Sequence, residues 1–215
     1  RNVVSALEYL YRWRLYEEGL VAEEPPRGGR VVVIGAGLSA IDAAEKALER
    51  GAEVYIAYRR TVAEAPAGRY PIYKLIREGA QFIELAQPTR IVTHNSTATA
   101  IVFTRMRLGE PDESGRPRPI PIPGSEFTLD TDLIILAIGE VPTPPFTDRF
   151  LNISLDRLGR IVVDRFYRTG SDRVFAAGDV VTGPSLVGRA FSSGLRAAKH
   201  LDNLLTRAKV VVRGG

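Results

Sequence analysis

A glycine-rich turn is the part of the sequence whose residue types and spacing best suit ligand binding. A β-branched run at residues 30–34 precedes the turn, and a stretch with one apolar and one charged face follows at residues 38–50. A glycine-rich turn placed between a strand and a helix predicts a site for the pyrophosphate of a dinucleotide, because the helix N-terminus offers free N–H groups and a positive dipole end. The turn is G-x-G-x-x-A in pattern and consists of Gly35, Ala36, Gly37, Leu38, Ser39 and Ala40.

Three small residues of this turn have distinct expected roles. Gly35 permits the tight turn after the strand, and Gly37 lets a phosphate approach the backbone. Ala40 is small enough for the helix to pack against the strand. The alternative is a strand–helix turn that binds nothing, which the flanking elements make the weaker interpretation.

The end of the next strand indicates which dinucleotide is bound. Residues 53–57 complete a βαβ unit, and Tyr58, Arg59 and Arg60 follow directly. An NAD-binding unit carries Asp or Glu at this place to hold the ribose 2′-hydroxyl, and no carboxylate is present here. Guanidinium groups pair with phosphate, so we expect NADPH, with its 2′-phosphate on Arg59 and Arg60. The alternative is that both arginines are solvated surface charges.

A second motif lies near the C-terminal end. An apolar, strand-like run ends at Gly178 and Asp179, and a helix is expected over residues 184–205. Taken alone, the motif fits an ordinary strand-end Asp that caps a helix. It resembles the C-terminal FAD motif of the two-dinucleotide-binding flavoprotein reductases, the pyridine nucleotide-disulfide oxidoreductase-like family. That resemblance implies that Asp179, beside Gly178, forms a hydrogen bond with the ribityl chain of FAD. It also implies that the start of the helix, at Leu186 and Val187, faces the pyrimidine end of the flavin, where negative charge gathers on reduction.

Further segments extend the resemblance to nearly the whole stretch from Val3 to about Leu205, closest to the glutamate synthase small (beta) subunit group. They are residues 5–10, residues 53–67 and the strand that ends in Ala137, Ile138 and Gly139, which the resemblance places beside a cofactor. Two features depart from the family. Its N-terminal FAD lobe is not found, and Leu38 stands where the small-subunit group often has Asn.

The elements that carry these motifs predict an α/β fold. We expect a Rossmann-like three-layer NAD(P)-binding domain with an antiparallel β-meander, plus the C-terminal part of an FAD-binding domain. The expected division is residues 1–27, a helix and linker from the FAD-domain side; 28–140, the NADPH-binding domain; 141–208, the FAD half-domain; and 209–215, a tail. Helices are expected over residues 3–18, 38–50, 69–79 and 184–205. Strands are expected over residues 30–34, 53–57, 81–85, 89–93, 99–108, 125–129, 133–138, 161–164 and 174–177. Pro142, Pro144 and Pro145 mark the crossing between the domains.

Composition excludes several kinds of site. The 215 residues include no cysteine, so disulfides, thiolate metal sites, iron–sulfur ligation and a thioredoxin reductase-type dithiol are excluded within this chain, and no metal site is predicted. The 29 basic residues are scattered among 25 acidic ones, for a net charge of +4, so no nucleic-acid partner is expected. No apolar run reaches the ~18 residues of a membrane span. A cytoplasmic location is the default, and the missing initiator Met suggests a fragment.

These expectations combine into a function. The chain is expected to be a fragment or subunit of an NADPH-dependent FAD oxidoreductase that passes hydride from NADPH to flavin and electrons on to a protein partner. No catalytic side chain is predicted, and His94 and His200 are expected to be structural or solvated. Two alternatives stay open. One is a non-catalytic NADPH-binding, regulatory or scaffold subunit. The other is a different electron-transfer flavoprotein, such as a ferredoxin:NADP transhydrogenase, a sulfide dehydrogenase or an amino-acid dehydrogenase subunit.

Overall fold

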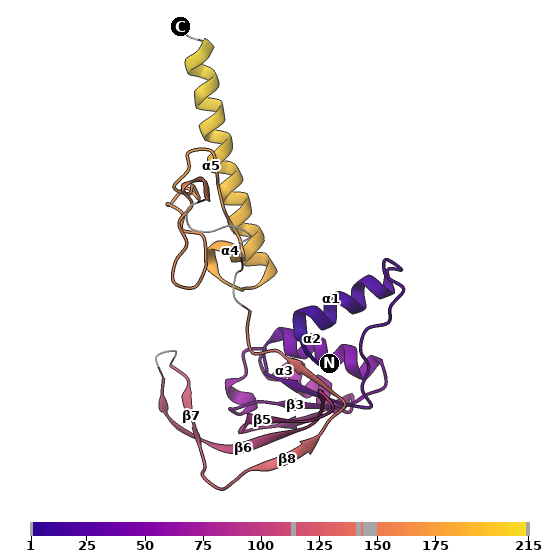
Figure 1. Ribbon diagram of the computed structural model, residues 1–215. Coiled ribbons are helices and arrows are strands. Elements are labelled where there is room, and N and C mark those ends of the chain that lie inside the picture. The colour runs from indigo at the N-terminus through magenta and orange to yellow at the C-terminus, as the bar shows by residue number, and fades with distance from the viewer. Residues whose placement is uncertain (1, 113–114, 141–142, 144–149, 214–215) are drawn as a thin grey trace. The chain divides into compact units, whose positions relative to one another are not determined.

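The computed structural model describes residues 2–112, 115–140, 143 and 150–213 (Figure 1). The chain divides into two compact units, Arg1–Gly139 and Glu140–Gly215, and each is described by itself. The proline-rich crossing expected at Pro142, Pro144 and Pro145 lies outside the described residues.

A parallel sheet forms the centre of the first unit. Within the described residues its strands run in the order β1-β9-β2-β3-β4, with all neighbouring pairs parallel. Their bounds are Val3–Ser5 (β1), Arg30–Ile34 (β2), Glu53–Ala57 (β3), Gln81–Ile83 (β4) and Leu133–Leu136 (β9). Three helices cover one face of this sheet, α1 (Ala6–Glu17), α2 (Leu38–Glu49) and α3 (Arg69–Arg77) (Figure 1). The predicted three-layer α/β fold is confirmed.

The β-branched run of β2 explains how the layers hold together. Val31 and Val33 belong to the core under the helices, whereas Val32 and Ile34 belong to a second core on the opposite face of the sheet. Successive side chains of a strand point to opposite faces, so a strand buried on both sides must be apolar at every position.

An antiparallel sheet closes that opposite face. It consists of β5 (Ala86–His94), β6 (Thr97–Pro111), β7 (Pro117–Pro121) and β8 (Phe127–Asp130), and both β5 and β8 pair with β6. Ile101 and Phe103 of β6 pack into the second core. The sequence predicted this antiparallel sheet, but it missed β7.

The prolines of β7 explain why the sequence pattern did not predict this strand. Pro117, Pro119 and Pro121 alternate along it, and proline usually argues against a strand. Here β7 pairs with the far half of β6, with Leu108 opposite Pro119. Residues two apart in a strand turn their N–H groups to the same edge, so all three prolines share the outer edge while Arg118 and Ile120 remain for the ladder.

The N-terminus corrects another expectation. Residues 3–5 were predicted to be helical, but they form β1 beside β9. Asn2 fixes this start, because its side chain accepts a hydrogen bond from the Ala98 N–H (2.7 Å) and donates to the Ala98 carbonyl (2.7 Å). Ser5 then caps α1 by accepting from the Glu8 N–H. Residues 1–27, expected on the FAD-domain side, therefore group with the first unit, since β1 pairs with β9 and α1 packs on α2.

The second unit has little regular structure before its long helix. The strands expected over residues 161–164 and 174–177 appear in the described residues only as single bridges, Leu155 to Ile161 and Arg168 to Phe175. A short helix, α4 (Asp179–Thr182), precedes α5 (Val187–Arg213), and η2 (Phe150–Asn152) is a 3-10 turn. The expected helix start at Pro184 is wrong, since Gly183 adopts a positive φ and ends α4 first. Residues 209–213 of the expected tail continue α5.

No helix in the described part of the chain is both long and apolar enough to cross a membrane.

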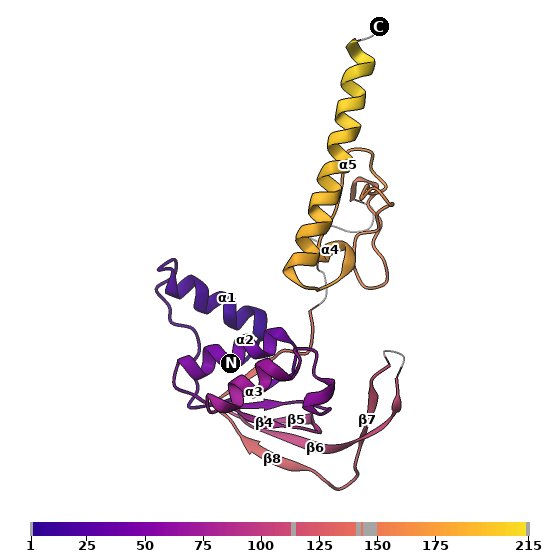
Figure 2. The same cartoon turned by 180° about the vertical axis from the view of Figure 1, so that it is seen from behind.

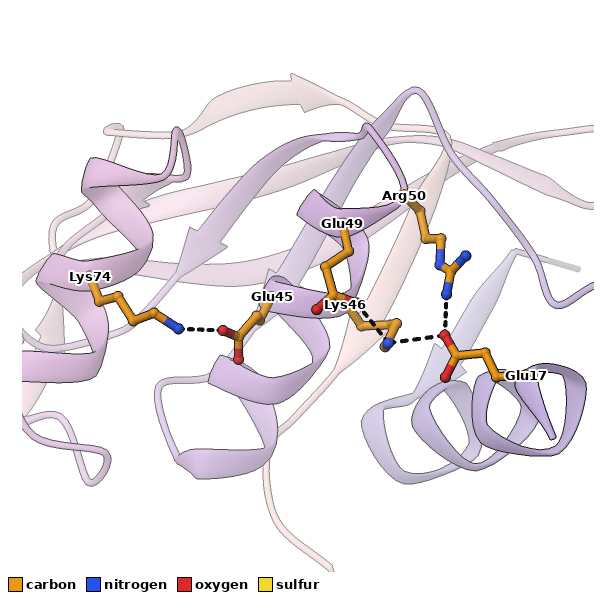
Figure 3. Close-up of polar contacts among 6 residues, drawn as sticks. All are labelled: Glu17, Glu45, Lys46, Glu49, Arg50 and Lys74. Atoms are coloured by element: carbon orange, nitrogen blue, oxygen red, sulfur yellow. Dashed lines mark hydrogen bonds and ion pairs between the residues drawn. The ribbon is translucent and has the colours of Figure 1, made fainter.

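Charged side chains join the three helices of the first unit at the surface (Figure 3). Lys46 of α2 donates to the Glu17 carboxylate of α1 (3.0 Å), and Arg50 donates to the same oxygen. Lys74 of α3 pairs with Glu45 of α2. The Arg50 guanidinium also lies over the buried Trp13 ring, 4.3 Å from its centroid, so the network sits directly above the helix-side core.

The Glu17 carboxylate predicts a pH dependence of stability. Its pKa lies below the usual value, chiefly because Lys46 donates a hydrogen bond to it. A carboxyl whose pKa is lower in the folded chain stabilises the fold above its unfolded pKa, about 4.3, and loses that contribution as the pH falls through the folded pKa. Glu17→Gln should therefore lower the melting temperature at about pH 7, with a difference from wild type that shrinks below about pH 4. Thermal unfolding across this range measures it, with Glu126→Gln as an exposed control. A difference independent of pH would contradict the expectation.

Candidate dinucleotide-binding site

The glycine turn lies at the carboxyl edge of the parallel sheet. It connects β2 to α2, and its first residue, Gly35, donates its N–H to the carbonyl of Ala57 at the end of β3 (3.0 Å). On the other side, the Ala137 N–H donates to the Ile34 carbonyl (2.8 Å). The turn is therefore held between the ends of β3 and β9, the edge at which open α/β sheets bind ligands.

Gly35 and Gly37 are glycines for different physical reasons. Gly35 has a φ of +127°, and a Cβ there would lie 2.2 Å from the Ala137 carbonyl oxygen, so no side chain fits. A Cβ at Gly37 would meet nothing within 4 Å. Packing within the protein thus dictates glycine at 35 only, and the space beside the Gly37 backbone is open to an approaching group.

The N-terminus of α2 is suited to an anion. Gly37 is its N-cap, no side chain caps the helix, and its first turn carries no acidic residue. Leu38 and Ser39 are exposed, while Ala40 is fully buried against the strand, as its small size predicted. Uncapped N–H groups and the helix dipole together attract negative charge to this end.

Residues 61–67, which the sequence marked only through the family resemblance, run beside the glycine turn and form a wall next to it. Ala67 donates its N–H to the Ala36 carbonyl (3.0 Å), which places the start of α3 beside the turn. Thr61 and Glu64 form a capping box that sets the path of this segment. The signal was the Thr61-x-x-Glu64 spacing, which precedes the wall directly.

The three residues after β3 have different surroundings. Tyr58 is buried, and its hydroxyl donates to the Glu64 carbonyl (3.1 Å), so it supports the wall. Arg59 is exposed at the same edge. Arg60 is 2% exposed, and its guanidinium donates to the Pro117 carbonyl (2.7 Å) and to Asp112 (2.6 Å). The expected pair of phosphate ligands therefore differs in its surroundings, because these two bonds engage Arg60 inside the protein, whereas Arg59 lies at the surface.

The segment after β9 leaves the sheet beside the glycine turn. Ala137 is half-buried, Ile138 is 74% exposed and Gly139 has a φ of +115°. Ala137 lies against Gly35, and the exposed Ile138 offers an apolar surface beside the turn.

The remaining predicted residues gather in the second unit. Gly178 has a φ of +78° and donates its N–H to the Ser193 hydroxyl (2.7 Å), which ties the turn before α4 to α5. Asp179 is exposed, and one carboxylate oxygen accepts a hydrogen bond from the Ser185 hydroxyl (2.9 Å). Its side chain does not cap α4. Leu186 and Val187 are exposed at the start of α5.

Within the described residues, no group of three or more His, Asp or Glu side chains is placed to hold a metal ion.

The fold and the turn define the class: an α/β protein of the FAD- and NAD(P)-binding type. Residues 5–194 match the family described as pyridine nucleotide-disulphide oxidoreductase, and the chain belongs to that family. NADPH and FAD, the two cofactors expected from the sequence, are the cofactors of this family.

Individual relatives agree with this assignment. The chain is 41% identical to the NADP(+)-dependent formate dehydrogenase subunit beta of Moorella thermoacetica over 84% of its own length and 26% of that protein. It is 34% identical to the glutamate synthase (NADPH) small chain of Escherichia coli K12, over 95% of this chain and 46% of that one. The fold matches T. acidophilum thioredoxin reductase with a TM-score of 0.65 at 24% identity, over 93% of this chain and 56% of that one. The chain thus spans less than two thirds of each of these proteins, and the resemblance to the glutamate synthase small-subunit group is confirmed.

The two glycines of the turn give a matched pair of predictions. Gly35→Ala should destabilise the first unit by about 2 to 4 kcal/mol, because the new methyl group meets a backbone carbonyl and the φ is unfavourable. Gly37→Ala should change stability by less than about 1 kcal/mol, because nothing lies within reach of its Cβ.

Gly37→Ala should nevertheless weaken NADPH binding about tenfold or more, since the methyl group occupies the space left for a phosphate. Thermal unfolding and calorimetric titration of both variants measure the two effects separately. Unchanged NADPH affinity in a folded Gly37→Ala variant would contradict the assignment of this turn.

Proposed function

We propose that this chain carries the NADPH-binding part and a portion of the FAD-binding part of an NADPH-dependent flavoprotein oxidoreductase similar to the glutamate synthase small chain. One observation carries the proposal. An open glycine turn leads into an uncapped helix, and the three residues that follow the adjacent strand β3 include the exposed Arg59 and no Asp or Glu.

In this proposal, each residue at the carboxyl edge of the parallel sheet has a definite role in binding NADPH. The backbone at Gly37 and the N-terminus of α2 bind the pyrophosphate of NADPH. Arg59 binds the 2′-phosphate, for which a guanidinium is suited in shape and charge. Ile138 and Gly139, at the exit from β9, lie along the nucleotide. These residues bind and orient, and no acid or base is assigned among them.

The second unit holds the groups proposed for FAD. Ser185 orients the Asp179 carboxylate through Oδ1, and the carboxylate lies at the surface, suited to accept hydroxyl groups of a ribityl chain. The anchoring of Gly178 to Ser193 fixes this turn against α5, whose exposed start at Leu186 and Val187 offers apolar contact. The chemistry that FAD supplies when bound is acceptance of a hydride from NADPH and onward electron transfer.

The electron acceptor is proposed to be a partner protein. Relatives named as a beta subunit and a small chain support an assembly with a further chain. The 41% identity to a formate dehydrogenase subunit favours, as a second candidate, a related electron-transfer flavoprotein with a different acceptor. A non-catalytic NADPH-binding or scaffold subunit differs from both in taking up no FAD. The cytoplasmic location expected from the sequence is part of the proposal.

Nucleotide preference tests the NADPH site. In calorimetric titrations the wild-type chain should prefer NADPH to NADH, and Arg59→Ala should raise the Kd for NADPH about 10- to 100-fold, the range for one lost charge-assisted contact. The Kd for NADH should change little. Arg90→Ala removes an exposed arginine from β5 and serves as the control. Binding of neither nucleotide by the wild type would refute the proposal.

Flavin content tests the second unit. After incubation with FAD and removal of the free cofactor, the wild-type chain should show the visible absorption of a flavoprotein. Asp179→Ala should reduce the bound FAD about tenfold, because the ribityl-binding carboxylate is lost. Asp172→Ala, another exposed carboxylate of this unit, should retain it. A colourless wild type that still binds NADPH would favour the non-catalytic alternative.

A further inference from the structure

The buried arginine next to Arg59 has a position that phosphate binding does not explain. Arg60 has its Nε bonded to the Pro117 carbonyl and a terminal nitrogen bonded to the Asp112 carboxylate. A guanidinium presents donors in a rigid fork, and this fork spans two groups from either side of one hairpin turn. The charge is therefore both buried and paired, which gives it a fixed structural role.

That hairpin is a two-stranded arm whose described residues are 105–112 and 115–121, in the far half of β6 and in β7 (Figures 1 and 2). Its turn is closed by the Asp112 N–H, which donates to the Arg116 carbonyl (2.8 Å). Its two strands pack tightly at Gly109, where a Cβ would lie 2.5 Å from Ile120 Cδ1.

The base of the arm is attached to the same segment that leaves β3. Leu85 donates its N–H to the Arg60 carbonyl (3.1 Å), and Met106, at the arm's base, donates to the Leu85 carbonyl (2.8 Å). Met106 is buried. The backbone of residue 60 thus supports the base of the arm, while its side chain holds the end near the turn.

We propose that the arm is the outer wall of the NADPH 2′-phosphate site, and that Arg60 is a positioning residue that holds this wall while Arg59 contacts the phosphate. The inference rests on the proposed NADPH-binding function. Arg59 is exposed, whereas Arg60 is buried and bonded to the arm. The bond to Pro117 also fixes the backbone beside Arg118, an exposed cation of the wall.

The two possible roles of Arg60 predict opposite effects of removing Asp112. If Arg60 were a phosphate ligand, Asp112→Ala would release its guanidinium and remove a repelling carboxylate, so NADPH would bind more tightly. If Arg60 positions the arm, the same substitution loosens the wall, and NADPH binds more weakly although a negative charge has been lost. Asp112 is 31% exposed and lies at the end of the arm, away from both cores.

The test compares Asp112→Ala with Glu110→Ala in the full chain. Glu110 is an exposed carboxylate on the same arm, so its removal changes the charge equally without touching the Arg60 contacts. Asp112→Ala should raise the Kd for NADPH about 5- to 10-fold and leave that for NADH nearly unchanged. It should also speed amide hydrogen exchange at Arg107, Arg118 and Ile120 relative to wild type. Glu110→Ala should leave exchange unchanged and NADPH affinity equal to or slightly above that of wild type.

The outcomes separate this inference from the function on which it rests. Tighter or unchanged NADPH binding in Asp112→Ala would overturn the positioning role, and so would unchanged exchange in the arm. If Arg59→Ala removes the preference for NADPH while Asp112→Ala behaves like Glu110→Ala, only the inference about the arm falls. If the wild-type chain binds neither nucleotide, both fall.

Discussion

The contact between Gly35 and the Ala137 carbonyl is the constraint on which the rest of the first unit depends. Only a residue without a side chain allows the turn after β2 to pass so close to the exit from β9. This approach sets where α2 starts, and it brings the ends of β2, β3 and β9 to one edge. The uncapped N–H groups of α2 and the open space at Gly37 come directly after this close passage, and the exposed Arg59 lies at the same edge.

Local patterns predicted the elements whose stability is local. The βαβ unit follows from a β-branched run, a glycine turn and an amphipathic helix, and all three lie within about thirty residues. The errors arise where the partner is distant in sequence. Residues 3–5 become a strand because β9 offers an open edge some 130 residues later, as the pairing of Val3 with Ile134 shows. The strands expected over residues 161–164 and 174–177 meet only single bridging partners among the described residues.

The candidate site shows the same difference between features encoded by neighbouring residues and features that depend on distant ones. The tight turn at Gly35, the open space at Gly37 and the close packing at Ala40 follow from backbone geometry that the motif encodes directly. Arg59 and Arg60 look equivalent in the sequence, and their difference depends on Asp112, which is 52 residues further along the chain. The wall at Ala67 was visible only as a resemblance, because one backbone hydrogen bond places it beside Ala36.

The alternating prolines of β7 have a consequence for how the protein behaves among other chains. An unpaired strand edge normally presents a row of N–H donors that a second polypeptide can pair with, which is a route to aggregation. On the outer edge of β7, the positions that would carry those donors are Pro117, Pro119 and Pro121. This edge of β7 therefore lacks the row of donors that the addition of another strand requires.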